Sequence, residues 1–378
     1  QQCCCDLSPI TMSTIALPTE KTSSNHHSAN GAKTMKALVY QGEGKIEWKD
    51  VPKPGIKKTT DAIVKVLKTT ICGTDLGILH GKTPSCKPGT TLGHEGVGVV
   101  EEVGSSVSNF KKGDHVIISC ITADGTCEYC KKQMYSHCED GGWILGHLIN
   151  GTQAEYVRIP HADMSLYAVP KGVDEEAAVM LSDILPTGHE IGVINGRVKP
   201  GDTIAIVGAG PIGMSALLTV QFDSPAKIYV RYLDENRLKL AKELGATHTI
   251  NSGAEDAVKR IMSETKDGVD VAIEAVGAPA TFGICQKIVR PGGHIANIGV
   301  HGKSVDLQIQ DLWIRNVTIT MGLVDTNTTP MLLRTVESGT IEPKKLITHH
   351  FKLAEIEKAY AVFGNAAKEK ALKMILSN

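Results

Sequence analysis

The pattern of apolar and polar residues changes near the middle of the chain. Residues 36–53 and 61–70 alternate between apolar and polar side chains, and residues 95–119 continue with Val-rich runs between glycine turns. Such alternation is typical of strands with one buried face. The first half of the chain is therefore predicted to be rich in β-structure.

After about residue 185 short apolar runs alternate with longer amphipathic stretches. This alternation indicates a doubly wound parallel sheet, so the predicted fold class is α/β. Strands are predicted at 203–207, 227–232, 249–250, 269–275 and 294–300, and helices at 211–222, 234–244, 254–264 and 279–289. The last stretch, about 330–378, is predicted to be mostly helical with one strand near 347–352.

Residues 1–34 differ from the rest of the chain. They are rich in Ser, Thr, His and Asn, with no hydrophobic period, no apolar segment like that of a secretory signal and no arginine. A stretch of this composition cannot bury enough apolar surface to fold, and it lacks the marks of a targeting peptide. It is predicted to be a disordered extension.

Composition and charge narrow the class of protein. The 378 residues are enough for two domains, and the formal net charge of −1 gives no reason to expect nucleic acid or an anionic membrane as a partner. No apolar run reaches the roughly 18 residues that a membrane-spanning helix needs. Several of the ten cysteines stand in tight C-x-x-C spacing, which favours metal binding over disulfides and predicts a reducing compartment, the cytoplasm.

A glycine-rich turn follows the predicted strand 203–207 and opens the next helix. It contains Gly208, Gly210, Pro211, Ile212 and Gly213 in G-x-G-x-x-G spacing. Such a turn lets backbone N–H groups and the start of a helix approach a pyrophosphate. Its position between a strand and a helix predicts a dinucleotide-binding site.

The end of the second strand of this unit bears on the choice of cofactor. An acidic residue there would bind the ribose 2′-hydroxyl of NAD, but this chain has Tyr232, preceded by Arg231. A guanidinium can pair with a 2′-phosphate, so the sequence favours NADP over NAD. Asp234 is predicted to be the N-cap of the following helix.

A cysteine-rich loop has the spacing of a structural zinc site. Cys127, Cys130 and Cys138 supply three thiolates, one short of a closed tetrahedral set. Asp124 stands three residues before Cys127, where a fourth ligand would lie, and Cys120 is a rival for that place. The alternative is three free thiols with no metal.

A second group of candidate catalytic or metal-binding residues is spread more widely along the sequence. It comprises Cys72 with Thr74, then His94 with Glu95, and finally Asp183. Spacing alone does not define a metal site here, because a lone His in a glycine-rich turn is more often structural and Asp183 could cap a helix.

From Met35 to Asn378 the chain resembles the zinc-dependent medium-chain alcohol dehydrogenases. Within that family it is most similar to the branch acting on secondary alcohols, in which Asp replaces the third Cys ligand. The resemblance rests on motifs in the family's order and spacing: Gly93-His94-Glu95-Gly96, Gly104, Gly113-Asp114, the cysteine-rich loop, Gly142-Trp143, the 183–188 segment and the glycine turn.

The resemblance implies a catalytic zinc held by Cys72, His94 and Asp183, with Glu95 beside it as a neighbouring or exchanging ligand. Three protein ligands leave a position open for substrate. The zinc would act as a Lewis acid on a small alcohol or ketone, and hydride would pass between the carbinol carbon and the nicotinamide. Thr74 matches the hydroxyl that begins the family's proton relay.

The resemblance also implies an architecture. A GroES-like β-barrel catalytic domain is expected at 35–187, completed by 326–378, and a Rossmann domain at 188–325. The branch is commonly tetrameric, so a homotetramer is predicted.

Three residues depart from the family pattern. Many relatives carry His where this chain has Gly77, so the relay would run through water, the cofactor ribose or His80. Asp124 replaces the first cysteine of the loop, and Tyr232 replaces the Asp of NAD-dependent relatives.

Two other functions remain open. One is a polyol or amino-alcohol dehydrogenase on the same scaffold. Trp143, Ile144 and Leu145 suggest an apolar substrate pocket, which disfavours polyols. The other is a non-catalytic protein that binds zinc or a nucleotide.

Overall fold

The computed structural model describes residues 33–378. The predicted extension 1–34 lies outside the described residues except for its last two, and Thr34 already opens the first strand. Within the described part, no helix combines the length and the apolar character needed to cross a membrane.

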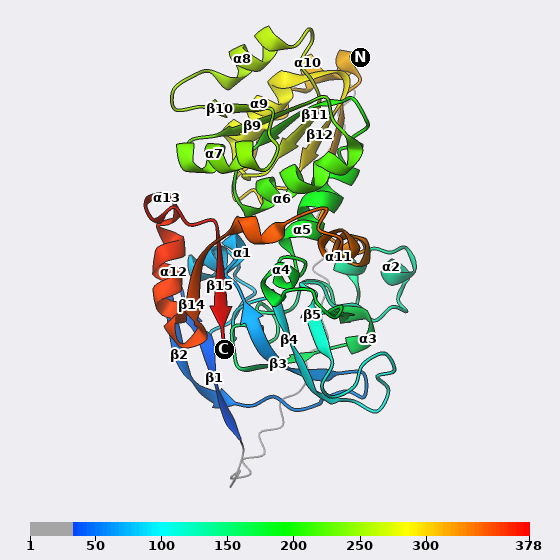
Figure 1. Cartoon of the computed structure of the whole chain (residues 1–378), viewed down its shortest axis with the longest axis vertical. Coiled ribbons are helices and arrows are strands. Elements are labelled where there is room, and N and C mark those ends of the chain that lie inside the picture. The colour runs from blue at the N-terminus through cyan, green and yellow to red at the C-terminus, as the bar shows by residue number, and fades with distance from the viewer. Residues whose placement is uncertain (1–32) are drawn as a thin grey trace, which may run out of the picture. The chain divides into compact units, whose positions relative to one another are not determined.

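The first half of the chain is rich in β-structure, as predicted (Figure 1). β1 and β2 form an antiparallel hairpin, and a seven-stranded sheet has the order β14-β15-β3-β4-β5-β7 with β6 paired to β3. Short helices connect these strands. The elements are β1 Thr34–Gly42, β2 Lys45–Pro52, β3 Ala62–Thr69, α1 Gly73–Leu79, β4 Gly96–Val103, β5 His115–Ile118, α2 Glu128–Lys131, η1 Tyr135–His137, β6 Tyr156–Ile159, α3 Ala162–Ser165, β7 Leu166–Ala168 and α4 Glu175–Val179.

The second half forms a parallel six-stranded sheet of order β10-β9-β8-β11-β12-β13, which confirms the doubly wound prediction. β8 lies where the strand order reverses, the place at which such sheets bind ligands. The elements are β8 Thr203–Val207, α6 Pro211–Val220, η3 Gln221–Asp223, β9 Lys227–Tyr232, α7 Glu235–Glu243, β10 His248–Asn251, α8 Ala257–Glu264, β11 Val269–Glu274, α9 Pro279–Ile288, β12 Val289–Asn297, α10 Ile309–Leu312, η4 Trp313–Arg315 and β13 Thr318–Met321.

One continuous helical segment joins the two sheets. α5, Ile184–Thr187, runs directly into a π-helix, η2, Gly188–Ile194. This segment lies close against α6, because a Cβ built on Gly188 would come within 2.6 Å of the backbone nitrogen of Ala216. The hydrophobic core is continuous here and includes Val97 from β4 and Ile273 from β11.

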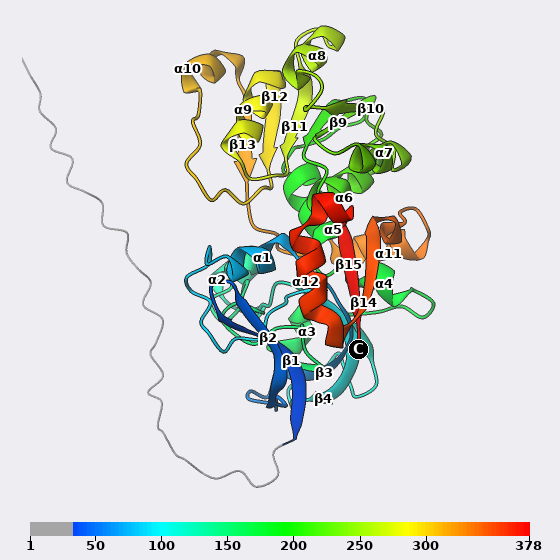
Figure 2. The ribbon, with the colours of Figure 1, turned by 90° about the vertical axis from the view of Figure 1, so that its left-hand side faces the viewer.

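The C-terminal stretch corrects the sequence prediction of a single strand. β14 was expected, but a second strand, β15, lies parallel to it and antiparallel to β3 (Figure 2). The side chains of Met374, Ile375 and Leu376 are fully buried, so this run behaves as a strand buried on both faces and shows no alternation. The elements are α11 Thr329–Glu337, η5 Pro343–Leu346, β14 Ile347–Lys352, η6 Leu353–Glu355, α12 Ile356–Gly364, α13 Ala366–Glu369 and β15 Lys373–Ser377.

Candidate active site

Four side chains from three distant segments converge in the β-rich part of the chain. Cys72 precedes α1, His94 and Glu95 precede β4, and Asp183 precedes α5. Their potential ligand atoms all lie within 4.8 Å of one another. Asp183 Oδ2 is 3.4 Å from His94 Nε2 and 3.7 Å from Cys72 Sγ. The structure thus brings together the four residues for which the resemblance implied a metal site.

A buried carboxylate holds two of these residues in place. Asp75, which is 1% exposed, accepts hydrogen bonds from the backbone N–H of Cys72 at 2.9 Å and from Gln153 Nε2 at 3.2 Å. Its other oxygen lies 3.7 Å from His94 Nδ1. Gln153 is itself fixed by the Tyr360 hydroxyl, which donates to its Oε1 at 2.8 Å. This second layer orients the thiol and the imidazole, as the outer partners of metal ligands do.

Lys373 on β15 forms a buried ion pair with Glu95. Its Nζ is 2.6 Å from Glu95 Oε1, and both side chains are 1% exposed. Glu95 Oε2 is buried without a hydrogen-bond partner among the described residues. Our sequence analysis missed Lys373, although a lysine beside the apolar run 374–376 was a signal, since a buried lysine needs a carboxylate partner.

Burial and mutual contact set the charges of the donors. Burial raises the pKa of the Cys72 thiol. Burial also acts to raise the pKa of Asp183, but the hydrogen bond and charge of His94 outweigh it and hold that pKa at about 2. For His94 burial acts to lower the pKa, and hydrogen bonds with Asp183 and Cys72 raise it well above its usual value.

The donor set fits a zinc ion. A thiol, an imidazole and carboxylates are the groups that zinc binds in proteins, and three such ligands with a fourth place open are typical of catalytic sites. Three acidic groups, Cys72, Glu95 and Asp183, lie together, and among residues 33–378 Lys373 is the one buried lysine beside them, so a divalent cation would offset their charge.

The cysteine-rich loop brings together a second group. Asp124, Cys127, Cys130 and Cys138 also place their ligand atoms within 4.8 Å of one another. Asp124 Oδ1 already accepts from the backbone N–H groups of Thr126 and Cys127, at 2.6 and 2.9 Å. Burial acts to raise the pKa of Asp124, but these hydrogen bonds outweigh it and hold the pKa at about 2. The loop therefore offers an ionised carboxylate together with three sulfur atoms.

Cys120 does not belong to this loop cluster, so its place as a rival fourth ligand is corrected. Its Sγ lies 3.8 Å from Asp183 Oδ1, beside the first cluster. Cys120 lies within the buried run 116–123 that continues β5, and its side chain packs with Ile121 and Val324 in the core. A cysteine seven positions before a C-x-x-C motif can thus face away from it.

The glycine turn has the geometry that pyrophosphate binding requires. Gly208 has φ +126°, which favours glycine, and Gly210 is the N-cap of α6 with Pro211 in its first turn. A Cβ on Gly213 would come within 1.9 Å of the Gly208 carbonyl oxygen, so only glycine permits this close contact. Ile212 is half-buried against the core. The N-terminus of α6 is left open at the switch point of the sheet.

Two arginines lie close to the end of β9, one on the strand and one on α7, where the sequence analysis named only the first. Arg231 Nε donates to Ser252 Oγ. Arg237, which we missed, donates to the Tyr232 hydroxyl at 3.1 Å, and its guanidinium carbon lies 5.2 Å from the centre of the Tyr232 ring. Asp234 caps α7 as predicted, accepting from the backbone N–H of Arg237 at 3.0 Å. Arg237 could have been anticipated from its place in the first turn of that helix.

Thr74, the predicted start of the proton relay, and Gly77, where the relay is interrupted, both lie on α1. Thr74 lies on α1, two residues after Cys72, and is half-buried. Gly77 lies one turn further along the helix, and a Cβ there would meet no atom within 4 Å. The helix therefore has room for a side chain at this position.

Trp143, the predicted substrate-pocket residue, stacks on His147 with ring centroids 4.2 Å apart. His147 Nε2 is hydrogen-bonded to Ser85 Oγ at 2.5 Å. Trp143 also packs against the cluster that contains Cys120, which places it near Asp183. Leu145, grouped with Trp143 in the sequence analysis, is fully buried in the core of the seven-stranded sheet instead.

Fold and site together define a class of protein: a dehydrogenase-like chain with a dinucleotide turn in one sheet and a zinc-type donor set in the other. Comparisons with known proteins agree. Residues 58–171 match the model of the alcohol dehydrogenase GroES-like domain, and residues 211–338 match that of the zinc-binding dehydrogenase family.

Individual relatives give the same result. The chain is 34% identical to an alcohol dehydrogenase of Cupriavidus necator, over 88% of this chain and 95% of the relative. It is 32% identical to the NADP-dependent isopropanol dehydrogenase of Thermoanaerobacter brockii, over 89% and 97%. A zinc-dependent alcohol dehydrogenase of Streptococcus pneumoniae, solved in its apo form, superposes with a TM-score of 0.87 at 58% identity, covering 91% of this chain and 98% of the other.

The chain belongs to the zinc-dependent medium-chain alcohol dehydrogenases. Its fold is a GroES-like unit combined with a Rossmann-type parallel sheet. It is an oxidoreductase that uses zinc and a nicotinamide cofactor to interconvert small alcohols with their carbonyl compounds.

Proposed function

We propose that the enzyme oxidises small secondary alcohols and reduces the corresponding ketones. The observation that carries this proposal is the convergence of Cys72, His94 and Asp183 near Trp143, whose indole supplies an apolar wall. A similar protein from Thermoanaerobacter brockii is named an isopropanol dehydrogenase, which supports a secondary alcohol. A polyol substrate would need polar anchors that an indole does not offer.

In this proposal Cys72, His94 and Asp183 hold the zinc, and Glu95 stands beside it, tied back by Lys373. When bound, the zinc would supply Lewis acidity toward the alcohol oxygen, and the nicotinamide cofactor would supply the hydride acceptor. Asp75 keeps the imidazole and the Cys72 backbone in register. The glycine turn after β8 binds the pyrophosphate through Gly208, Gly210 and the first N–H groups of α6.

The proton of the alcohol leaves through the hydroxyl of Thr74. Gly77 cannot pass it on, so it continues through water, the cofactor ribose or His80. His80 is the C-cap of α1 and is exposed, which suits the solvent end of such a path.

For the cofactor we favour NADP. Arg231 lies at the end of β9 and Arg237 in the first turn of α7, and among the described residues neither is paired with a carboxylate, although Arg237 also donates to the carbonyl oxygens of Ala209 and Ala371. Two guanidinium groups beside a hydroxyl can pair with a 2′-phosphate. Because position 232 is Tyr and not Asp, no carboxylate repels that phosphate. The isopropanol relative is itself named NADP-dependent.

The experiment that tests these proposals is a set of parallel initial-rate measurements. Propan-2-ol and acetone are assayed with NADP(H) and NAD(H), with and without a zinc chelator, in the parent and in Tyr232→Asp. We expect chelator-sensitive turnover that prefers NADP, and a shift toward NAD in the variant. Turnover of polyols but not of propan-2-ol would overturn the substrate class, and an unchanged cofactor ratio in Tyr232→Asp would overturn the NADP assignment.

We also propose a structural zinc held by Asp124, Cys127, Cys130 and Cys138. The shared position of their ligand atoms supports it. Thiolate ligands of this kind suit a reducing compartment, and we propose the cytoplasm.

The domain division follows the two sheets. We propose a catalytic domain at 35–187 completed by 326–378, and a Rossmann domain at 188–325. Strands β14 and β15 pair into the first sheet, while all six strands of the other sheet fall between Thr203 and Met321.

We propose that the enzyme assembles as a homotetramer, beginning with contacts along β13. This strand lies at the edge of the six-stranded sheet, where its backbone can pair with a second copy. Nearby apolar side chains are largely exposed, which is typical of an interface. They include Val300 at 86%, Trp313 at 68%, Ile314 at 69% and Met321 at 68% exposed.

A further inference from the structure

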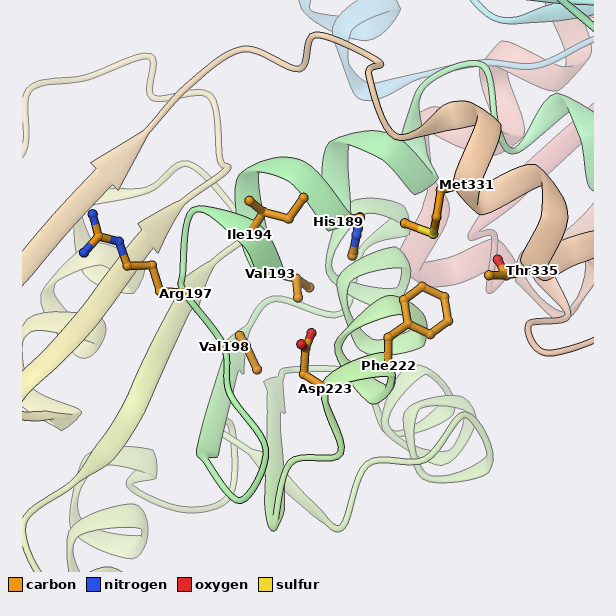
Figure 3. A pocket seen from close by; sticks show the side chains of 9 residues that line it. All are labelled: His189, Val193, Ile194, Arg197, Val198, Phe222, Asp223, Met331 and Thr335. Atoms are coloured by element: carbon orange, nitrogen blue, oxygen red, sulfur yellow. The ribbon is translucent and has the colours of Figure 1, made fainter.

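A hollow of about 430 Å³ lies beside the helical segment that joins the two sheets (Figure 3). Its walls come from η2, from η3 and from α11. A volume of this size is within the range of small-molecule sites. None of the residues assigned above to zinc, cofactor or substrate lines it, so it is separate from the proposed active site.

The hollow is mainly apolar. Val193, Ile194 and Val198 line it on one side, and Phe222 and Met331 on the other. Ile194 is 51% exposed, whereas Val193 is only 2% exposed, so the apolar surface runs from the outside of the molecule inward. Such a surface is best covered by an apolar ligand.

One polar group stands in this wall without a partner. His189 is 6% exposed, and its Nδ1 is buried with no hydrogen bond from the described residues. The ring packs edge-on against Phe222, with centroids 5.7 Å apart. Burial lowers the pKa of His189 to about 4, so the ring is neutral and offers one N–H donor and one acceptor. Because Nδ1 is closed off from the hollow, a hydroxyl there would pair with Nε2, which also has no hydrogen-bond partner among the described residues.

Charge around the hollow gives no net preference for an ion of either sign. Arg197 and Asp223 both line it, and they carry opposite charges. A carboxylate would be attracted by Arg197 and repelled by Asp223, and an amine would be attracted by Asp223 and repelled by Arg197. The apolar lining therefore decides in favour of an uncharged ligand.

We propose that this hollow is a binding site for a small uncharged molecule with an aromatic or alicyclic body and one hydroxyl, held by a hydrogen bond to His189. The site does not depend on the oxidation of alcohols, since it lies apart from Cys72 and the glycine turn. Its ligand is bound and released without chemical change.

The test uses 4-bromophenol, which has no hydrogen on its hydroxyl-bearing carbon and so cannot give up a hydride. Crystals of the holoenzyme are soaked in it, and the anomalous signal of bromine locates the probe. We expect a bromine peak in the hollow, with the phenol oxygen at a hydrogen-bond distance from His189. A hollow that stays empty, or that a neighbouring copy of the chain fills, would overturn the proposal.

Calorimetric titration of the same probe gives a solution measurement. His189→Phe keeps the ring but removes its nitrogens, and we expect it to weaken binding about tenfold, the effect of one lost hydrogen bond. Thr335→Phe should block the hollow from α11, while Thr335→Val, which keeps its volume, should bind as the parent does. Equal affinity in the parent, His189→Phe and Thr335→Phe would place the probe elsewhere and contradict the assignment.

Discussion

The chain contains two clusters of potential zinc ligands, and they are built in different ways. The cluster of Cys72, His94, Glu95 and Asp183 draws its members from three segments, and other buried side chains hold them. The cluster of Asp124, Cys127, Cys130 and Cys138 comes from a single loop, whose hydrogen bonds are made mostly within the loop itself.

The difference shows which cluster depends on a metal for its shape. Around the first, Asp75 and Lys373 contact the donors from β-sheet and helix positions and are themselves 1% exposed or less. In the second, Cys130 and Cys138 are buried, but the donors accept hydrogen bonds from the backbone of the loop itself. A site held by side chains from other segments should keep its geometry when the metal leaves, whereas a loop held by its own backbone should not.

The largest effect is expected from Cys72→Ser. It removes a thiolate from the first cluster and leaves the chain around it intact. Because zinc acting as a Lewis acid contributes several kcal/mol to the transition state, kcat should fall by about a thousandfold or more. Steady-state rates with propan-2-ol measure this, and dinucleotide binding by fluorescence titration serves as the control. Undiminished turnover would show that Cys72 is not a ligand.

A second large effect is expected from Lys373→Met, which leaves Glu95 without its partner in a fully buried place. Breaking a buried pair in this way costs about 3–5 kcal/mol, so the variant should melt well below the parent. Lys373→Arg keeps the charge and should recover most of the lost stability. Differential scanning calorimetry of the parent and the two variants measures their melting temperatures. A Lys373→Met protein as stable as the parent would contradict a structural role for the pair.

The same contrast explains how much of the molecule could be predicted from its sequence. Five of the six strands of the parallel sheet and the glycine turn are local patterns, so their places along the chain were predicted, whereas β13 was missed. The loop cluster was also visible, because Cys127 and Cys130 lie three residues apart. β15 was missed because a fully buried strand has no alternating pattern, and a short apolar run is ambiguous between strand and helix.

The first cluster could not be assembled from spacing. Cys72 and Asp183 lie 111 residues apart, and only the path of the folded chain brings them together. Only the resemblance to a known family predicted that these residues come together. The sequence did not predict the supporting residues Asp75, Gln153 and Lys373. They contact the donors or one another, and no sequence motif identifies such partners. Cys120 was misplaced because proximity in sequence to the loop did not show which way its side chain points.

A moderate effect is expected in the loop cluster when its carboxylate is replaced. Asp124→Cys supplies a fourth thiolate, which binds zinc more softly and tightly than a carboxylate does. The variant should lose its loop zinc at a higher chelator concentration than the parent and should melt at a higher temperature. The chelator concentration at which the loop zinc is lost is measured from the zinc content of the protein, by mass spectrometry, during a chelator titration. Parallel loss of this zinc in both proteins would mean that Asp124 and its replacement do not bind the metal.

The smallest effect is expected from a substitution at Ser136, where hydrogen bonds join the cysteine-rich loop to the segment around Asp325. Ser136 donates from its backbone N–H and from its hydroxyl to Asp325 Oδ1, at 2.8 and 2.6 Å. The turn that follows Asp325 is in turn fixed by Glu190 on η2, whose carboxylate accepts from the backbone of Thr326 and Thr328. The chain therefore holds one side of the loop without any metal.

Ser136→Ala removes the hydroxyl and leaves the backbone hydrogen bond. A lost hydrogen bond to a charged group costs about 1.5–3 kcal/mol, so Tm should fall by a few degrees while kcat stays near that of the parent. Ser105→Ala, at an exposed turn distant in sequence from both clusters, is the matched control and should leave Tm unchanged. If Ser136→Ala lowered kcat as strongly as Cys72→Ser, the loop would be coupled to the reacting atoms, and the division into a preorganised site and a metal-shaped loop would fail.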